Sequence, residues 1–83
     1  MVVPSPLDRI RVRRRTFGEA RLTLLRERGV SLTEIAHRLG VSLPAVSRVN
    51  RAERRSRAVE REIARRLGLT EAQAFPEWQN AGA

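Results

Sequence analysis

One stretch of the chain decides the fold: Leu32-Thr-Glu-Ile-Ala-His-Arg-Leu-Gly-Val-Ser-Leu-Pro-Ala-Val-Ser-Arg-Val-Asn-Arg51. It predicts two short helices joined by a three-residue turn. Helices that cross steeply over so short a turn need a small residue where their backbones approach, and a residue that tolerates positive φ at the turn. Ala36 and Gly40 meet these two needs. The inward faces are expected to carry the apolar residues Ile35, Leu39, Val41, Val46 and Val49.

Helix start signals recur on both sides of this stretch. Three segments open with a hydroxyl residue followed three positions later by Glu or Gln, which is the spacing of a capping box. They are Thr16-Phe-Gly-Glu19, Ser31-Leu-Thr-Glu34 and Thr70-Glu-Ala-Gln73. Ser42 and Ser56 are the expected N-caps of two further helices.

Helix stop signals follow these starts. Gly29, Gly40 and Gly68 stand where a left-handed residue ends a helix, and Pro76 breaks the last segment. Pro44 does not break its helix, because amides of the first turn have no acceptor within the helix. The sequence therefore predicts an all-α fold of five short helices around a helix-turn-helix.

Residues 1–15 are expected to form a flexible basic arm ahead of a domain over residues 16–78, and residues 79–83 a C-terminal tail. The arm holds five arginines against one aspartate, a local charge of +4. Its alternation over residues 10–13 would also suit a short edge strand. Three of its arginines are expected to follow a phosphate strand or enter a minor groove, unless the arm is only a solvated tail. They are Arg13, Arg14 and Arg15.

The charge of the chain points to a polyanionic partner. Seventeen basic residues, all of them arginine, stand against nine acidic ones in 83 residues and leave a net charge of +8. Genomic base composition can explain the choice of arginine over lysine, but it cannot explain the excess of basic over acidic residues. A domain this basic attracts nucleic acid above other partners.

Several classes of protein are excluded by composition. With no cysteine, a disulfide framework and a thiolate zinc site are ruled out. No long apolar run indicates a membrane span or signal peptide, so a cytoplasmic protein, associated with the nucleoid when bound to DNA, is expected.

The sequence gives no sign of an enzyme. It contains no Ser-His-Asp arrangement, phosphate-cradling loop or catalytic carboxylate pair, and its single histidine, His37, has no metal-ligand companion. No metal, cofactor or small-molecule ligand is expected. The few aromatic residues are too widely spaced to stack single-stranded bases and are expected to be core or lid residues. They are Phe17, Phe75 and Trp78, of which Trp78 could instead lie in a dimer interface.

The stretch over residues 32–51 resembles the helix-turn-helix of the lambda-repressor-like superfamily of phage and bacterial regulators. The residues that follow it are similar to the Ner-like branch of small phage-type regulators, in which the next helix ends in Leu-Gly and an aromatic-Pro pair closes the fold. The matching segments are Arg55-Ser-Arg-Ala-Val-Glu60, Ile63-Ala-Arg-Arg-Leu-Gly68 and Phe75-Pro-Glu-Trp78. The resemblance covers about residues 16–78. It implies a transcriptional regulator, in particular a repressor, that binds double-stranded DNA.

In this motif the second helix, here about residues 43–51, enters the major groove. The expected base-reading residues are Ser42, Leu43, Pro44, Ser47 and Arg48. Arg48 leads this set because a guanidinium can bind guanine O6 and N7 together. Leu43 and Pro44 depart from the polar residues usual in the family. Leu43 can contact only a thymine methyl group, so the bendability of the operator is expected to add specificity.

A second set of residues is expected to bind phosphates. Ser31 and Thr33 begin a helix whose free amides and dipole favour an anion. Arg51 ends the recognition helix, and three further arginines follow it. These are Arg54, Arg55 and Arg57. Glu60, Arg61 and Arg65 are expected to form ordinary surface pairs.

A single unit of this size covers little DNA, so a homodimer on a palindromic operator is expected, joined through the last helix and the tail. Two other functions remain open from the sequence. One is a non-specific architectural or recombination accessory protein, and the other is a protein-interaction module such as an antitoxin-like adaptor.

Overall fold

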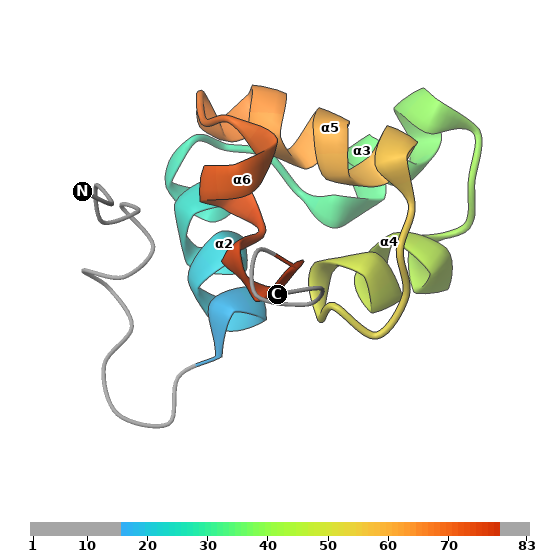
Figure 1. Ribbon diagram of the computed structural model, residues 1–83. Coiled ribbons are helices and arrows are strands. Elements are labelled where there is room, and N and C mark those ends of the chain that lie inside the picture. The colour runs from blue at the N-terminus through green and yellow to red at the C-terminus, as the bar shows by residue number, and fades with distance from the viewer. Residues whose placement is uncertain (1–15, 79–83) are drawn as a thin grey trace, which may run out of the picture.

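The computed structural model describes residues 16–78, which form five α-helices and one short 3-10 helix (Figure 1). No strand occurs among these residues, so the all-α prediction is confirmed. The expectations for the arm, with Arg13, Arg14 and Arg15, and for the tail lie outside the described residues. The elements are α2 (Phe17–Glu27), α3 (Leu32–Leu39), α4 (Leu43–Asn50), α5 (Arg57–Leu67), α6 (Glu71–Ala74) and η1 (Pro76–Trp78).

All five predicted N-caps are confirmed. In each, a hydroxyl oxygen accepts a hydrogen bond from the amide three residues later, which satisfies a donor that the helix itself leaves unpaired. The capping box is complete only at α6, where Gln73 Oε1 also accepts from the Thr70 amide at 3.0 Å. At α3 the predicted return bond is replaced, because the Glu34 carboxylate pairs with Arg66 of α5.

The C-termini of α2, α3, α4 and α5 share one pattern, the Schellman motif. A residue with positive φ donates its amide to the carbonyl three residues back, and the next amide donates to the carbonyl five residues back. Glycine occupies the positive-φ position in three helices, as predicted, at Gly29, Gly40 and Gly68. After α4 the same position is held by Ala52, with φ 59°. An L-residue is strained there because its Cβ crowds the following carbonyl.

Replacing Ala52 with glycine is therefore expected to stabilise the domain by about 1 kcal/mol, since glycine adopts this conformation without the Cβ clash. Urea unfolding followed by circular dichroism measures the change. Gly68→Ala is the matched control, because a Cβ at Gly68 would meet no atom within 4 Å and only backbone strain would be added. It should destabilise by a similar amount. Equal stability of all three proteins would contradict the assignment.

The core gathers around α5, which packs on α3, α4 and α6. Three of the predicted inward residues, Ile35, Val46 and Val49, are fully buried there, and Leu39 packs against them half-buried. The prediction for Val41 is wrong, since 41% of this residue is exposed. Its amide is bound to the Ala36 carbonyl at 3.0 Å as part of the α3 C-cap. This bond directs the chain toward α4 and leaves the Val41 side chain on the surface.

A buried arginine, unforeseen from the sequence, joins distant parts of the chain. Arg21 of α2 is 0% exposed, and each of its five N–H groups finds an acceptor. Nε donates to Asn50 Oδ1 at 3.2 Å, Nη1 to the Ala74 carbonyl at 2.8 Å and to Glu77 Oε1 at 2.8 Å. Nη2 donates to Glu77 Oε2 at 2.6 Å and to the Asn50 carbonyl. The guanidinium also lies 4.0 Å from the centroid of the Phe75 ring.

The same cluster brings α2 into close contact with the end of α4. Asn50 is 1% exposed and donates from Nδ2 to the Gly18 carbonyl at 3.1 Å. A Cβ on Gly18 would approach the Asn50 carbonyl oxygen to 3.0 Å, so only glycine fits this crossing without displacement. In Figure 1, α6 and η1 lie beside α2 and lead toward the end of α4. Arg21 therefore fixes the C-terminal end of α4 to the body of the domain.

Arg21→Met is expected to destabilise the domain by about 3–5 kcal/mol, because it leaves the Glu77 carboxylate and two carbonyls without their donor in a buried site. Urea denaturation measures this loss. Arg26→Met is the matched control on the same helix, since Arg26 is exposed and its replacement should change stability by no more than about 0.5 kcal/mol. A similar decrease in the free energy of unfolding for both variants would show that the buried cluster contributes no more to stability than an exposed arginine does.

A second ionic cluster joins α3 to α5. The Glu62 carboxylate, almost buried, accepts hydrogen bonds from Arg65 at 3.1 and 2.8 Å and pairs with Arg38 of α3 at 3.4 Å. The hydrogen bond from Arg65 holds the pKa of Glu62 below its ordinary value. These contacts hold α3 on α5. None of the helices within residues 16–78 is long and apolar enough to cross a membrane.

Candidate nucleic-acid interface

The turn between α3 and α4 consists of Gly40, Val41 and Ser42. Gly40 adopts φ 69°, as the sequence predicted, and closes α3. Ser42 begins α4 by accepting the Ala45 amide on its Oγ at 3.2 Å, and Pro44 lies in the first turn. Ser42 thus keeps its hydroxyl hydrogen free for a partner outside the helix.

The two sides of α4 differ sharply. The inner side buries Val46, Val49 and Asn50. On the outer side Leu43, Pro44 and Arg48 are exposed and Ser47 is half-buried. Figure 1 shows α4 at the margin of the domain, with no further helix beyond it. Four of the five predicted base-reading residues therefore present an exposed surface, and Ser47 borders it.

Arg48 is the exposed cation in the middle of this outer side. Within residues 16–78 its side chain makes no hydrogen bond or ion pair, although its charge adds to the Arg51 hydrogen bond in lowering the pKa of Glu53. Its guanidinium therefore retains all five donors for an external acceptor.

Arg51 and Ser47 are tied to each other. Arg51 Nη1 donates to Ser47 Oγ at 2.6 Å, while Nε and Nη2 donate to the two Glu53 carboxylate oxygens at 2.9 and 3.2 Å. The hydrogen bonding from Arg51 lowers the pKa of Glu53, and the same interaction raises the pKa of Arg51. About half of each side chain is exposed. An anion that binds Arg51 must therefore compete with Glu53.

This pairing predicts the titration of Glu53. Its carboxyl carbon, followed by NMR, should titrate below the ordinary value of 4.5, and Arg51→Ala should move the pKa back toward that value. Because the folded-state pKa is depressed, any stabilisation by the pair is present above the unfolded pKa and is lost as pH falls through the folded one. Arg54→Ala is the control, since Arg54 does not contribute to the shift. If the pKa of Glu53 is the same in wild type and in Arg51→Ala, the pairing is refuted.

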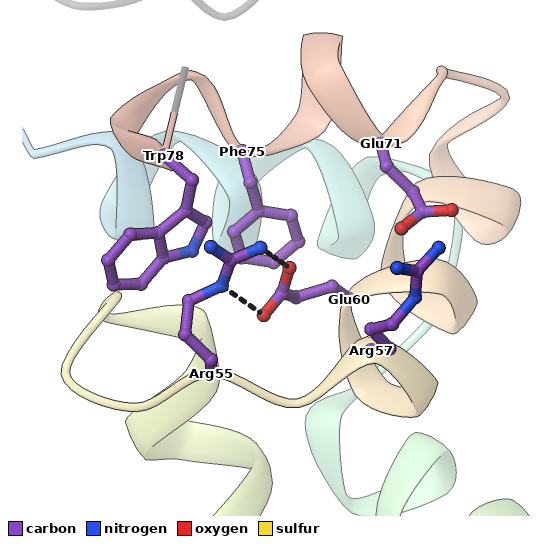
Figure 2. Close-up of a pocket in the computed structure, with 6 residues that line it drawn as sticks. All are labelled: Arg55, Arg57, Glu60, Glu71, Phe75 and Trp78. Carbon is purple, nitrogen blue, oxygen red and sulfur yellow. Dashed lines mark hydrogen bonds and ion pairs between the residues drawn. The ribbon is translucent and has the colours of Figure 1, made fainter. Parts of the chain in front are cut away.

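The three arginines that follow α4 have different surroundings. Arg54 is exposed and unpaired within the described residues. Arg55 is held by the domain itself: Nε and Nη2 donate to the two oxygens of Glu60 at 3.2 and 3.1 Å, and the guanidinium lies 4.5 Å from the centroid of the Trp78 ring. Figure 2 shows this arrangement, with Arg55 covering the indole.

The expected surface pairing of Glu60 with Arg61 and Arg65 is wrong. Glu60 is 3% exposed and accepts hydrogen bonds from Arg55 and, at 2.9 Å, from the Ser56 amide at the start of α5. Position 60 faces the body of the domain, so its carboxylate lies inside, where the Arg55 guanidinium and the Ser56 amide are available as donors. Arg61 pairs instead with Glu71 at 3.6 Å, and Arg65 pairs with Glu62.

Arg55 and Arg57 line a shallow pocket of about 150 Å³ together with Glu60, Glu71, Phe75 and Trp78 (Figure 2). The Arg57 side chain points toward Glu71 in this view, but no ion pair joins them. Phe75 is buried in the core and Trp78 is half-buried beneath Arg55, in agreement with their expected roles as core and lid residues. Two carboxylates in so small a pocket disfavour a bound anion.

Ser31 and Thr33 lie at the N-terminus of α3, the end away from the turn to α4. Ser31 Oγ caps the helix by accepting the Glu34 amide at 3.1 Å. Both residues line a pocket of about 280 Å³ with Arg26 of α2, an exposed cation that sequence reasoning missed. The short connection between α2 and α3 could have indicated its position. Only four residues join the two helices, so the end of α2, which carries Arg26, must lie beside the start of α3.

No group of three or more His, Cys, Asp or Glu side chains among residues 16–78 is placed to hold a metal ion. Comparison of the chain with models of known protein families, with curated proteins and with solved structures finds no match.

Proposed function

We propose that the domain is a helix-turn-helix module that binds double-stranded DNA with sequence preference, and that α4 is its recognition helix. The connection supports this proposal, because three residues with a left-handed Gly40 join α3 to α4. Ala36, buried in the middle of α3, supplies the small residue that a close crossing needs. In such modules the second helix enters the major groove with its N-terminal part foremost.

The observation that carries the proposal is the two-sided character of α4. Its inner side is fixed by buried residues and by the Arg21 cluster, whereas its outer side exposes Arg48 without a partner. The helix contains no acidic residue, and the next one along the chain, Glu53, is paired with Arg51. A rigid helix with an uncovered, cationic outer side suits the negative potential of a DNA groove.

The contacts of each arginine suggest its part in binding. Arg48 is free to bind the O6 and N7 atoms of a guanine. Arg54 is exposed and suited to a phosphate of a flanking strand, whereas Arg57 lies in the pocket whose two carboxylates disfavour an anion and is expected to contribute less. Arg51 and Arg55 are already paired with Glu53 and Glu60, and each pair must break before the arginine binds a phosphate. Their contribution to DNA affinity is therefore expected to be smaller than that of an unpaired arginine.

The N-terminus of α3 would grip a second phosphate. Ser31 and Thr33 lie there at the positive end of the helix dipole, where the Glu34 amide is bound to Ser31 Oγ but the amides of Leu32 and Thr33 precede it, and Arg26 adds a charge from α2. The eight residues of α3 separate this end from the turn by about 12 Å, at 1.5 Å per residue. This spacing lets the domain contact the backbone beside the groove that α4 enters.

As a regulator, the protein would act as a homodimer on a palindromic operator and repress transcription by occupying it. Two recognition helices would then lie about 34 Å apart, one turn of DNA. The small size of one unit favours this arrangement, because a single short helix reads only a few base pairs.

The proposal is tested by selecting bound duplexes from a random pool and measuring affinity for the selected and for scrambled sequences. Arg48→Ala should relax preference at one base pair, at a cost of about 1–3 kcal/mol there. Arg54→Ala should weaken binding evenly across sequences and reduce the salt slope by about 1. Fluorescence anisotropy at several salt concentrations measures both effects.

Arg61→Ala is the matched control, because it removes the same charge from a side chain directed toward Glu71 of α6. It should leave sequence preference intact. Equal affinity for selected and scrambled duplexes would favour a non-specific architectural protein. Absence of duplex binding near physiological salt would favour a protein-interaction module.

A further inference from the structure

We propose that Val41 and Leu43 form a methyl-reading patch, which recognises the C5-methyl group of thymine in the major groove. This inference rests on the proposed function and names the base that the leading end of α4 selects. The patch consists of these two side chains, one on each side of the N-cap residue Ser42.

Exposure singles these two residues out. Val41 is 41% and Leu43 43% exposed, and they are the exposed large hydrophobic residues of the region 16–78. Single apolar side chains scattered over a surface need no explanation, but here two are separated by one residue at the helix end that would meet DNA first. The core does not need them there, because Val46 and Val49 already fill the inner side of α4.

The backbone beneath the patch is held rigidly before any ligand arrives. The Val41 amide is bound to the Ala36 carbonyl at 3.0 Å, and Ser42 Oγ accepts the Ala45 amide at 3.2 Å. Pro44 further restricts the chain, since its ring fixes φ. A preorganised apolar surface loses little conformational freedom on binding, so even a small contact contributes to affinity.

Charge around the patch favours DNA as its occupant. Arg48 is the charged residue of α4, and Arg51 beyond it binds the next carboxylate along the chain, Glu53. A peptide groove of this kind would offer apolar contacts over a longer face, whereas here the exposed apolar surface ends at the first turn of the helix. The apolar group that the major groove offers at a base pair is the methyl group of thymine.

The position of the patch relative to Arg48 also predicts the spacing of the two bases when α4 lies along the groove. Leu43 and Arg48 are five residues apart, about 7.5 Å along the helix axis. With bases stacked about 3.4 Å apart along a strand, this separation corresponds to about two base-pair steps. A half-site should therefore place a thymine about two steps from the guanine that Arg48 reads.

The test replaces each thymine of the selected duplex in turn by deoxyuridine, which lacks only the methyl group. At one position of each half-site, affinity for the wild-type protein should fall about three- to fivefold, as expected for one buried methyl group. The double variant Val41→Ala, Leu43→Ala should weaken binding to the thymine duplex by a similar factor and bind the thymine and uracil duplexes equally. Arg48→Ala is the matched control and should retain the wild-type preference for thymine over uracil.

A second measurement places 5-methylcytosine or cytosine at that position. If the patch reads the methyl group, the wild-type protein should bind the 5-methylcytosine duplex more tightly than the cytosine duplex, and the double variant should bind both equally. If no thymine-to-uracil exchange changes the affinity of the wild-type protein, the methyl-reading patch is overturned, while sequence-preferring binding remains in place. Failure to bind any duplex would instead overturn the proposed function, and this proposal with it.

Discussion

The interaction on which the rest of the structure depends is the burial of the Arg21 guanidinium between α2, the end of α4 and the segment from α6 to η1. Hydrophobic burial alone is weakly directional, and a core made largely of Val, Leu, Ile and Ala allows short helices to slide against one another. Five donors arranged in one plane, each matched to an acceptor, allow far fewer arrangements. A charge without these partners would cost several kcal/mol in the same place. The cluster thus selects one packing of the helices.

This constraint reaches the candidate interface through Asn50. The residue ends α4, binds Arg21 with its side chain and its carbonyl, and donates to Gly18. At the other end of the helix, Ser42 and the Gly40 turn fix where α4 begins. Both ends being held, the outer side of α4 keeps its direction relative to the phosphate-binding candidates at the start of α3. Precise placement of this kind is what a base-reading helix requires, because hydrogen bonds to base edges tolerate little displacement.

Local signals made most of the fold predictable. The caps at Thr16 and Ser56 and the left-handed glycines depend on neighbouring residues, so they could be read directly from the chain. Of the features that were missed, the burial of Arg21 depends on distant contacts, whereas Val41 and Glu60 were misjudged from their residue type alone. Arg21 looked like one more surface arginine, because its partners at Ala74 and Glu77 lie 53 and 56 residues away. Val41 was expected inside because it is apolar, and Glu60 outside because it is charged. The candidate site could be located on α4, but which arginines are already paired could not be foreseen.

The span of the Arg21 cluster has a consequence for how the domain is made. During synthesis α2 leaves the ribosome early, yet three of the five Arg21 N–H groups find their acceptors only after the segment through Glu77 has been translated. Until then only the two hydrogen bonds to Asn50 are available to the guanidinium, and its other N–H groups remain hydrated. Nascent chains halted before Ala74 would therefore present a loosely packed set of helices, open to proteases. The helices therefore reach their final packing only after the last few residues of the domain have been synthesised.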